Sequence, residues 1–137
     1  MIERRIDGFF YGLFMDSETL RESQVVAMSP RRAYVDGYAL CIGRRATLVP
    51  TPGARAYGML FALTHDELER LYTASGLEEY RPEAILTQSM DGETLPALCY
   101  NLREVPGPDE ANTDYAVRLR AVLGKLGFPS EYIASIS

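Results

Sequence analysis

Residues 55–71, RAYGMLFALTHDELERL, contain the change from strand to helix that decides the fold. Residues 55–63 are the most apolar run of the chain, and a short apolar run of this kind predicts a central, buried strand. Thr64 follows at the position of a helix N-cap, and Glu67 stands three residues later, which is the spacing of a capping box. The helix that begins here is expected to end at Gly76, because glycine readily adopts the backbone conformation that terminates helices.

Similar signals place the other elements on both sides of this stretch. An Asp-Gly pair at residues 91–92 predicts a hairpin, and TPGA at residues 51–54 predicts a turn between two strands. Strands and helices do not alternate regularly, which predicts a mixed α/β (α+β) domain with a small curved sheet and flanking helices, in one domain over residues 1–137. The remaining strands are expected over residues 6–15, 33–43, 45–50, 81–89 and 94–103, and the remaining helices over residues 16–23, 113–127 and 129–137.

The composition argues against several classes of function. A net charge of -5 disfavours a nucleic-acid surface, which needs concentrated basic side chains. The pair Arg44–Arg45 is interpreted as solvated surface, with an anion-recruiting role as the alternative. No apolar run approaches the roughly 20 residues that a membrane helix needs, and the N-terminus has no signal-peptide pattern. The favoured interpretation of Cys41 and Cys99 is two buried free thiols in a cytoplasmic protein. A disulfide between them is the open alternative.

Metal and nucleophile chemistry have little support in the sequence. The one histidine, His65, stands in the first turn of the predicted helix, where a surface position is expected. Two widely separated cysteines do not have the spacing of a zinc site, and no glycine-rich phosphate-binding motif is present. We therefore expect no metal and no cofactor. Carboxylate or hydroxyl chemistry in a small pocket, or binding alone, is what remains.

Four stretches of the sequence, taken in order, resemble the gamma-glutamylcyclotransferase-like family. FFYGLFMDSETL at residues 9–20 resembles the family's Tyr-Gly loop, and AYGMLFALTHDELERL at residues 56–71 resembles its strand-to-helix signature. GLEEYRPEAI at residues 76–85 is similar to the segment that leads into the next strand, and LGFPSEYIASI at residues 126–136 is similar to the C-terminal segment. The resemblance implies a compact mixed domain around a small barrel-like sheet, with a cavity on one side.

The resemblance also implies a reaction. Active members cyclise a gamma-glutamyl amine or amino acid and release 5-oxoproline. The substrate's own α-amine attacks the γ-carbonyl, so the protein folds the substrate back, takes a proton and stabilises the oxyanion. Backbone N–H groups of the Tyr-Gly loop suit the last task. The implied partner is a small gamma-glutamyl or carboxylate-bearing molecule. The implied binding residues are Tyr11, Gly12, Leu13, Phe14, Met15 and Tyr80. Packing in the core is the alternative role for Leu13, Phe14, Met15 and Tyr80.

The position of the family's catalytic glutamate holds a serine in this chain. That glutamate stands immediately before the helix-ending glycine, which places Ser75 at its position. Leu13 likewise stands where the family usually has serine. Glu78 and Glu79 are the candidate replacements for the base, with a solvated turn as their alternative. Glu83, on the following strand, is a weaker candidate.

Three functions stay open at this point. The chain is a cyclotransferase with a relocated carboxylate, a non-catalytic member that binds a small molecule, or an enzyme for another acyl reaction in which Ser75 donates a hydrogen bond. The two departures from the family pattern, at Leu13 and Ser75, favour binding. The retained Tyr-Gly loop favours catalysis.

Overall fold

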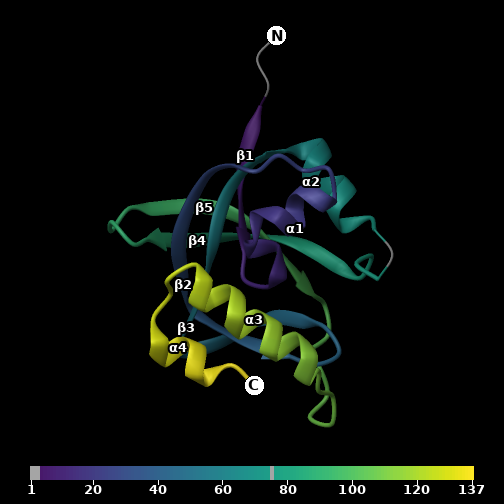
Figure 1. The fold of residues 1–137 in the computed structure, drawn as a ribbon, viewed down its shortest axis with the longest axis vertical. Helices are drawn as coiled ribbons and strands as arrows, with labels where there is room; N and C mark the ends of the chain where they lie inside the picture. The colour runs from purple at the N-terminus through teal and green to yellow at the C-terminus, as the bar shows by residue number, and fades with distance from the viewer. Residues whose placement is uncertain (1–3, 75) are drawn as a thin grey trace.

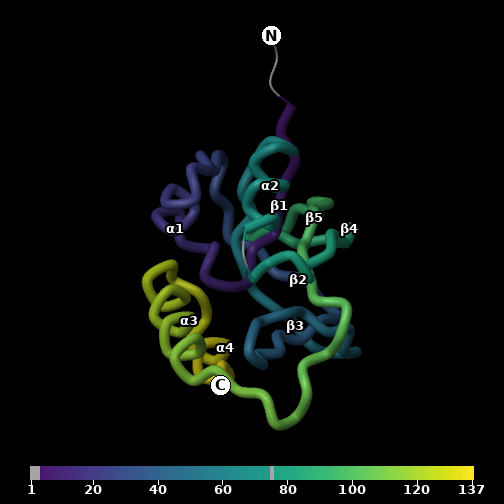
Figure 2. Tube along the Cα trace, turned by 90° about the vertical axis from the view of Figure 1, so that its right-hand side faces the viewer, coloured from purple at the N-terminus to yellow at the C-terminus, as the bar shows by residue number. Residues whose placement is uncertain are grey.

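The computed structural model describes residues 4–74 and 76–137, so Ser75 lies outside the described residues. Helices α1, α3 and α4 lie on one side of the strands, as the tube in Figure 2 makes visible. The elements in chain order are β1 (Arg5–Phe10), η1 (Leu13–Met15), α1 (Ser17–Glu22), β2 (Met28–Ile42), β3 (Ala46–Thr64), α2 (His65–Tyr72), β4 (Tyr80–Ser89), β5 (Thr94–Leu102), α3 (Thr113–Lys125) and α4 (Ser130–Ser135) (Figure 1).

The strands close into a barrel in the order β1-β3-β2-β4-β5. Neighbours along this order are antiparallel, and a parallel contact between β1 and β5, at Gly8 and Leu98, completes the closure. Strands β2 and β3 form one long hairpin, which continues past the barrel to lie beside α3 and α4 (Figure 1). This architecture confirms the mixed α/β fold and the curved, barrel-like sheet.

The turn predicted at residues 51–54 is wrong, because these residues continue strand β3. Pairing with β2 is regular on both sides of them, and the irregularity lies between Asp36 and Tyr38, where residues 51–54 oppose only Gly37. Gly37 and Gly53 have φ angles of +87° and +82°. The Pro-Gly chemistry therefore makes a bulge instead of a chain reversal, and a bulge lets a long strand bend.

The aromatic run at residues 6–15 divides into two elements, so the prediction of one strand is wrong beyond Phe10. Leu13–Met15 form a single 3-10 turn, in which the Met15 N–H donates to the Gly12 carbonyl at 3.0 Å. Asp16 then caps α1 by accepting a hydrogen bond from the Glu18 N–H. This turn places the Tyr-Gly loop next to the end of β1.

The predicted capping box at Thr64 is confirmed. The Glu67 N–H donates to Thr64 Oγ1 at 3.1 Å, and the Thr64 N–H donates to Glu67 Oε1 at 2.9 Å. Glu67 also accepts the Val26 N–H at 3.0 Å and pairs with Arg5 at 3.3 Å. One carboxylate thus holds the start of α2 against β1 and the loop that follows α1.

The apolar core has two parts. One part lies inside the barrel and comes from the strands and the Tyr-Gly loop, with Phe9, Leu60 and Cys99 among its fully buried members. The other part lies between the sheet and the helices, with Phe61 and Leu119 among its buried members. The helices are therefore held to the barrel by burial of apolar side chains, the dominant favourable contribution to folding.

Both cysteines are free, and no disulfide joins them. Cys99 is buried, as predicted, whereas Cys41 is only half-buried. Within the described residues, no helix has the length and apolar character needed to cross a bilayer.

Candidate functional site

A pocket of about 270 Å³ lies where the end of β1, the Tyr-Gly loop and α3 meet. Tyr72 and Leu77, which stand on either side of residues 73–76, both contribute to its wall. Within the described part of the chain, its lining contains no aspartate, glutamate or histidine. The lining residues are Phe10, Tyr11, Gly12, Leu13, Phe14, Thr19, Arg44, Arg45, Ala46, Tyr72, Leu77, Tyr80, Tyr115 and Arg118.

The Tyr-Gly loop approaches α3 so closely that only glycine fits at position 12. A Cβ added to Gly12 would overlap the hydroxyl oxygen of Tyr115. The Leu13 N–H donates to that same oxygen at 3.4 Å. The backbone amide that the family resemblance assigns to the cradle is therefore covered by a phenol from α3.

Four phenols face this pocket, from Tyr11, Tyr72, Tyr80 and Tyr115. Burial raises the pKa of each of them, and for Tyr11 and Tyr72 the pKa lies well above its usual value. All four hydroxyls are consequently protonated at neutral pH and act as neutral hydrogen-bonding groups. Tyr11 donates to the Tyr100 carbonyl at 2.8 Å, and Tyr80 donates to the Ala46 carbonyl.

Aromatic packing fixes the wall that Tyr72 forms. Its ring stacks on Tyr100, with ring centroids 3.9 Å apart and planes 7° apart. Phe14 meets Tyr72 edge-on at 6.0 Å, and Tyr80 lies against it at 5.9 Å. Tyr72 is thus part of an aromatic cluster at the pocket wall.

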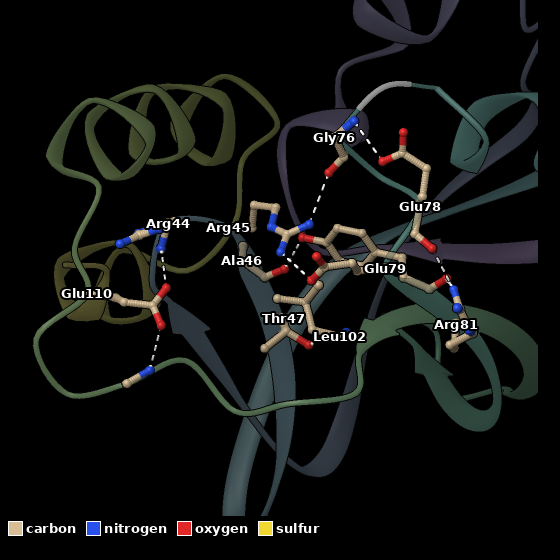
Figure 3. Close-up of polar contacts among 12 residues, drawn as sticks. Arg44, Arg45, Ala46, Thr47, Gly76, Glu78, Glu79, Arg81, Leu102 and Glu110 are labelled. Carbon is tan, nitrogen blue, oxygen red and sulfur yellow. Dashed lines mark hydrogen bonds and ion pairs between the residues drawn. The ribbon is translucent and has the colours of Figure 1, made fainter.

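Three arginines line the same pocket: Arg44, Arg45 and Arg118. Arg45 is engaged by the loop after α2, because it donates to the Gly76 carbonyl at 3.1 Å and to Glu79 Oε2 at 2.6 Å (Figure 3). The hydrogen bond to Glu79 raises the pKa of Arg45. Arg45 thereby holds the loop and the β2–β3 connection together.

The candidate replacement bases lie outside the pocket. The side chain of Glu79 is 71% exposed and is paired with Arg45. Glu78 is also exposed, and its Oε2 accepts the Gly76 N–H at 2.9 Å (Figure 3). Glu83 is exposed on β4. Ser75, the remaining candidate, lies outside the described residues.

Most of the predicted binding residues come together at the pocket. The lining includes the loop residues Tyr11–Phe14 and also Tyr80. Met15 does not line it; its side chain is 1% exposed and belongs to the core between sheet and helices. The 3-10 turn explains this difference, because it directs Met15 away from the pocket that Leu13 and Phe14 line.

Several lining residues were not predicted to belong to the pocket, namely Tyr115, Thr19, Leu77 and the three arginines. Arg44 and Arg45 occupy the connection between two predicted strands, and an arginine pair at such a site usually is solvated surface. Tyr115 and Arg118 are three residues apart on α3, which places them on the same helix face. That shared face is the one local signal for these two residues, and it does not show that the helix faces the pocket.

The site offers little to a metal ion. Among residues 4–74 and 76–137, no three histidine, cysteine, aspartate or glutamate side chains are grouped in a way that could hold one. Its donors are phenols, guanidinium groups and backbone amides, which suit an anion or a carbonyl oxygen.

Comparisons with known proteins agree with this geometry. A family model described as gamma-glutamyl cyclotransferase, AIG2-like, matches residues 8–117. No curated protein sequence gives a significant match. A solved structure described as a gamma-glutamyl cyclotransferase superimposes with a TM-score of 0.79 at 16% identity, over 98% of this chain and 89% of that one.

Two further solved structures have the same fold. An uncharacterised protein from Homo sapiens superimposes with a TM-score of 0.78 at 18% identity, over 98% of this chain and 89% of its own. A yeast gamma-glutamyl cyclotransferase specific to glutathione superimposes with a TM-score of 0.67 at 12% identity, over 97% and 94%. At these identities the likeness concerns the fold.

Proposed function

Because the chain belongs to the gamma-glutamyl cyclotransferase, AIG2-like family, we propose that it binds a gamma-glutamyl compound in the pocket beside Tyr11 and Gly12 and lacks the base that cyclisation requires. One observation carries this proposal: the described lining contains phenols and guanidinium groups and no carboxylate or histidine. The chain is then a binding member of its family.

The requirement for a base follows from the reaction. The α-ammonium of a gamma-glutamyl group has to lose a proton before it attacks the γ-carbonyl. A phenol whose pKa is raised by burial stays protonated and cannot accept that proton, and a guanidinium cannot either. A serine hydroxyl at position 75 is no base near neutral pH without a partner. The lining supports recognition better than proton transfer.

Recognition has a clear donor in Tyr115. Its oxygen accepts the Leu13 N–H, and within the described chain its own proton has no acceptor. That proton can be donated to a ligand's carbonyl oxygen. Gly12 makes the arrangement possible, since any side chain there would displace the phenol.

The test compares Ser75→Glu with Ser75→Gln, a side chain of the same length that cannot act as a base. We expect release of 5-oxoproline from a gamma-glutamyl dipeptide by Ser75→Glu, and none by the wild type or by Ser75→Gln. Release of 5-oxoproline by the wild type would refute the claim that the base is missing. No release by Ser75→Glu, together with no binding of the dipeptide by the wild type, would refute the assignment of the pocket.

A second candidate function is cyclisation with Glu79 as a relocated base. One observation favours it: Glu79 Oε2 lies 2.6 Å from an Nη atom of Arg45, a residue that lines the pocket. If a ligand carboxylate displaced Glu79 from Arg45, the glutamate would be released beside the ligand. This candidate predicts turnover by the wild type that is lost in Glu79→Gln and retained in Glu78→Gln.

We also propose that the protein works in the cytoplasm. The two free thiols support this location, because a reducing compartment keeps cysteines unpaired. Fractionation of cells that express the full chain tests it, and recovery with membranes or in the medium would contradict it.

A further inference from the structure

Two arginines at the mouth of the pocket, Arg44 and Arg118, bear on the class of ligand. We infer that their guanidinium groups form an anion-binding subsite, and that the ligand is a gamma-glutamyl amino acid whose distal carboxylate they bind, and not a gamma-glutamyl amine. The inference rests on the proposed function, because it requires the gamma-glutamyl end to bind inside the pocket.

Both guanidinium groups are available for a ligand. Arg44 comes from the β2–β3 connection and Arg118 from α3, and both residues are exposed. Within residues 4–74 and 76–137, neither guanidinium makes a hydrogen bond or an ion pair. Arg45, by contrast, is held by Glu79 and Gly76, and the side chain of Arg44 points away from it (Figure 3).

The carboxylate that lies near Arg44 is itself engaged. Glu110 accepts the Gly107 N–H at 2.8 Å and the backbone N–H of Arg44 at 3.1 Å (Figure 3). These two bonds, followed by the charge of Arg44, lower the pKa of Glu110. Glu110 thus fixes the backbone of the connection and makes no ion pair with the Arg44 side chain.

The local charge differs from that of the whole chain. The protein has a net charge of -5, yet three guanidinium groups and no carboxylate line this pocket within the described residues. A cleft with one sign of charge concentrates ligands of the opposite sign. Glu79 compensates the charge of Arg45, so the guanidinium groups of Arg44 and Arg118 are the two that attract an anion to the pocket.

The lining groups lie at different depths, and this difference sets the orientation of the ligand in the pocket. Tyr11 is 6% exposed, whereas Arg44 and Arg118 belong to the exposed surface. A gamma-glutamyl group placed against the phenols leaves its amide substituent at the mouth. An amino acid presents a carboxylate there, which guanidinium groups bind well; a simple amine presents no anion.

The experiment uses two ligands that differ only in that carboxylate, gamma-glutamylglycine and gamma-glutamylmethylamide. By titration calorimetry we expect the wild type to bind gamma-glutamylglycine about tenfold more tightly than gamma-glutamylmethylamide, which is the gain that two partly exposed ion pairs would provide. Arg44→Gln and Arg118→Gln should each weaken the binding of gamma-glutamylglycine about threefold. Both variants should bind gamma-glutamylmethylamide with the affinity of the wild type. Arg21→Gln, on the exposed end of α1 and outside the pocket, is the matched control.

Two outcomes separate this inference from the proposed function. If the wild type binds both compounds equally, or the arginine variants weaken both equally, the arginines do not bind a distal carboxylate and the inference is overturned while the proposed function stands. If neither compound binds, the proposed function fails and the inference with it. Unchanged thermal unfolding of the variants establishes that any loss arises from the site.

Discussion

The contact between Gly12 and Tyr115 gives a prediction that tests how the pocket is built. A methyl group at position 12 would overlap the Tyr115 hydroxyl oxygen, while the ring carbon that carries this hydroxyl lies 3.5 Å from the added Cβ, an ordinary contact distance. Gly12→Ala should therefore destabilise the protein, and removal of the hydroxyl in Tyr115→Phe should make room for the methyl group.

The magnitudes follow from the two contacts. Overpacking at an ordered site costs about 1 to 3 kcal/mol, which we expect for Gly12→Ala. Tyr115→Phe alone removes one long hydrogen bond from the Leu13 N–H, at 3.4 Å, and should cost about 0.5 to 1 kcal/mol. In the double variant the overlap is absent, so it should be about 1 to 2 kcal/mol more stable than the sum of the single changes predicts.

Urea unfolding of the wild type, both single variants and the double variant measures this coupling. A favourable coupling places the Tyr-Gly loop against α3 as described. Costs that simply add, within about 0.3 kcal/mol, would mean that the two residues do not touch in solution. Such a result would refute the reasoning about the pocket wall.

Two further predictions concern the scaffold. Burial raises the pKa of Glu67, but hydrogen bonds from Thr64 and Val26 outweigh it and lower the pKa overall. The stabilisation from Glu67 is therefore complete above the unfolded-state pKa near 4.5 and is lost as the pH falls through the lower folded-state pKa. Glu67→Gln should cost about 1 to 3 kcal/mol at pH 7 and flatten the acid side of the stability curve measured by thermal unfolding; an unchanged acid side would contradict this. Gly53→Ala should destabilise the protein by about 1 kcal/mol, because φ is +82° at this position. Gly124→Ala in α3, where an added Cβ meets open space, should instead stabilise the protein by about 0.5 to 1 kcal/mol. Equal urea midpoints for the two variants would disprove the assigned backbone conformations.

Local chemistry was sufficient to predict the elements whose signals act over a few residues. The capping box at Thr64 involves residues three apart, and the hairpin between β4 and β5 follows from its Asp-Gly turn. The TPGA segment failed for the opposite reason. Its turn chemistry is real, but pairing with β2 continues on both sides, and this long-range pairing converts the turn into a bulge.

The candidate site was predictable only where it is local. The Tyr-Gly loop lies in one short stretch, and the family resemblance located it. Met15 was assigned to the pocket because it follows the same stretch, yet the 3-10 turn buries it in the core. The pocket's arginines and Tyr115 come together because the barrel closes and α3 folds back over it, and nothing in their local sequence records that approach.

The central claim is that the pocket binds a gamma-glutamyl compound without cyclising it. The most direct measurement is calorimetric titration of the wild-type protein with gamma-glutamylglycine, followed by assay of the same sample for 5-oxoproline. The account predicts saturable binding and no 5-oxoproline above the rate in buffer. Catalytic release of 5-oxoproline, or no binding at all, would contradict it.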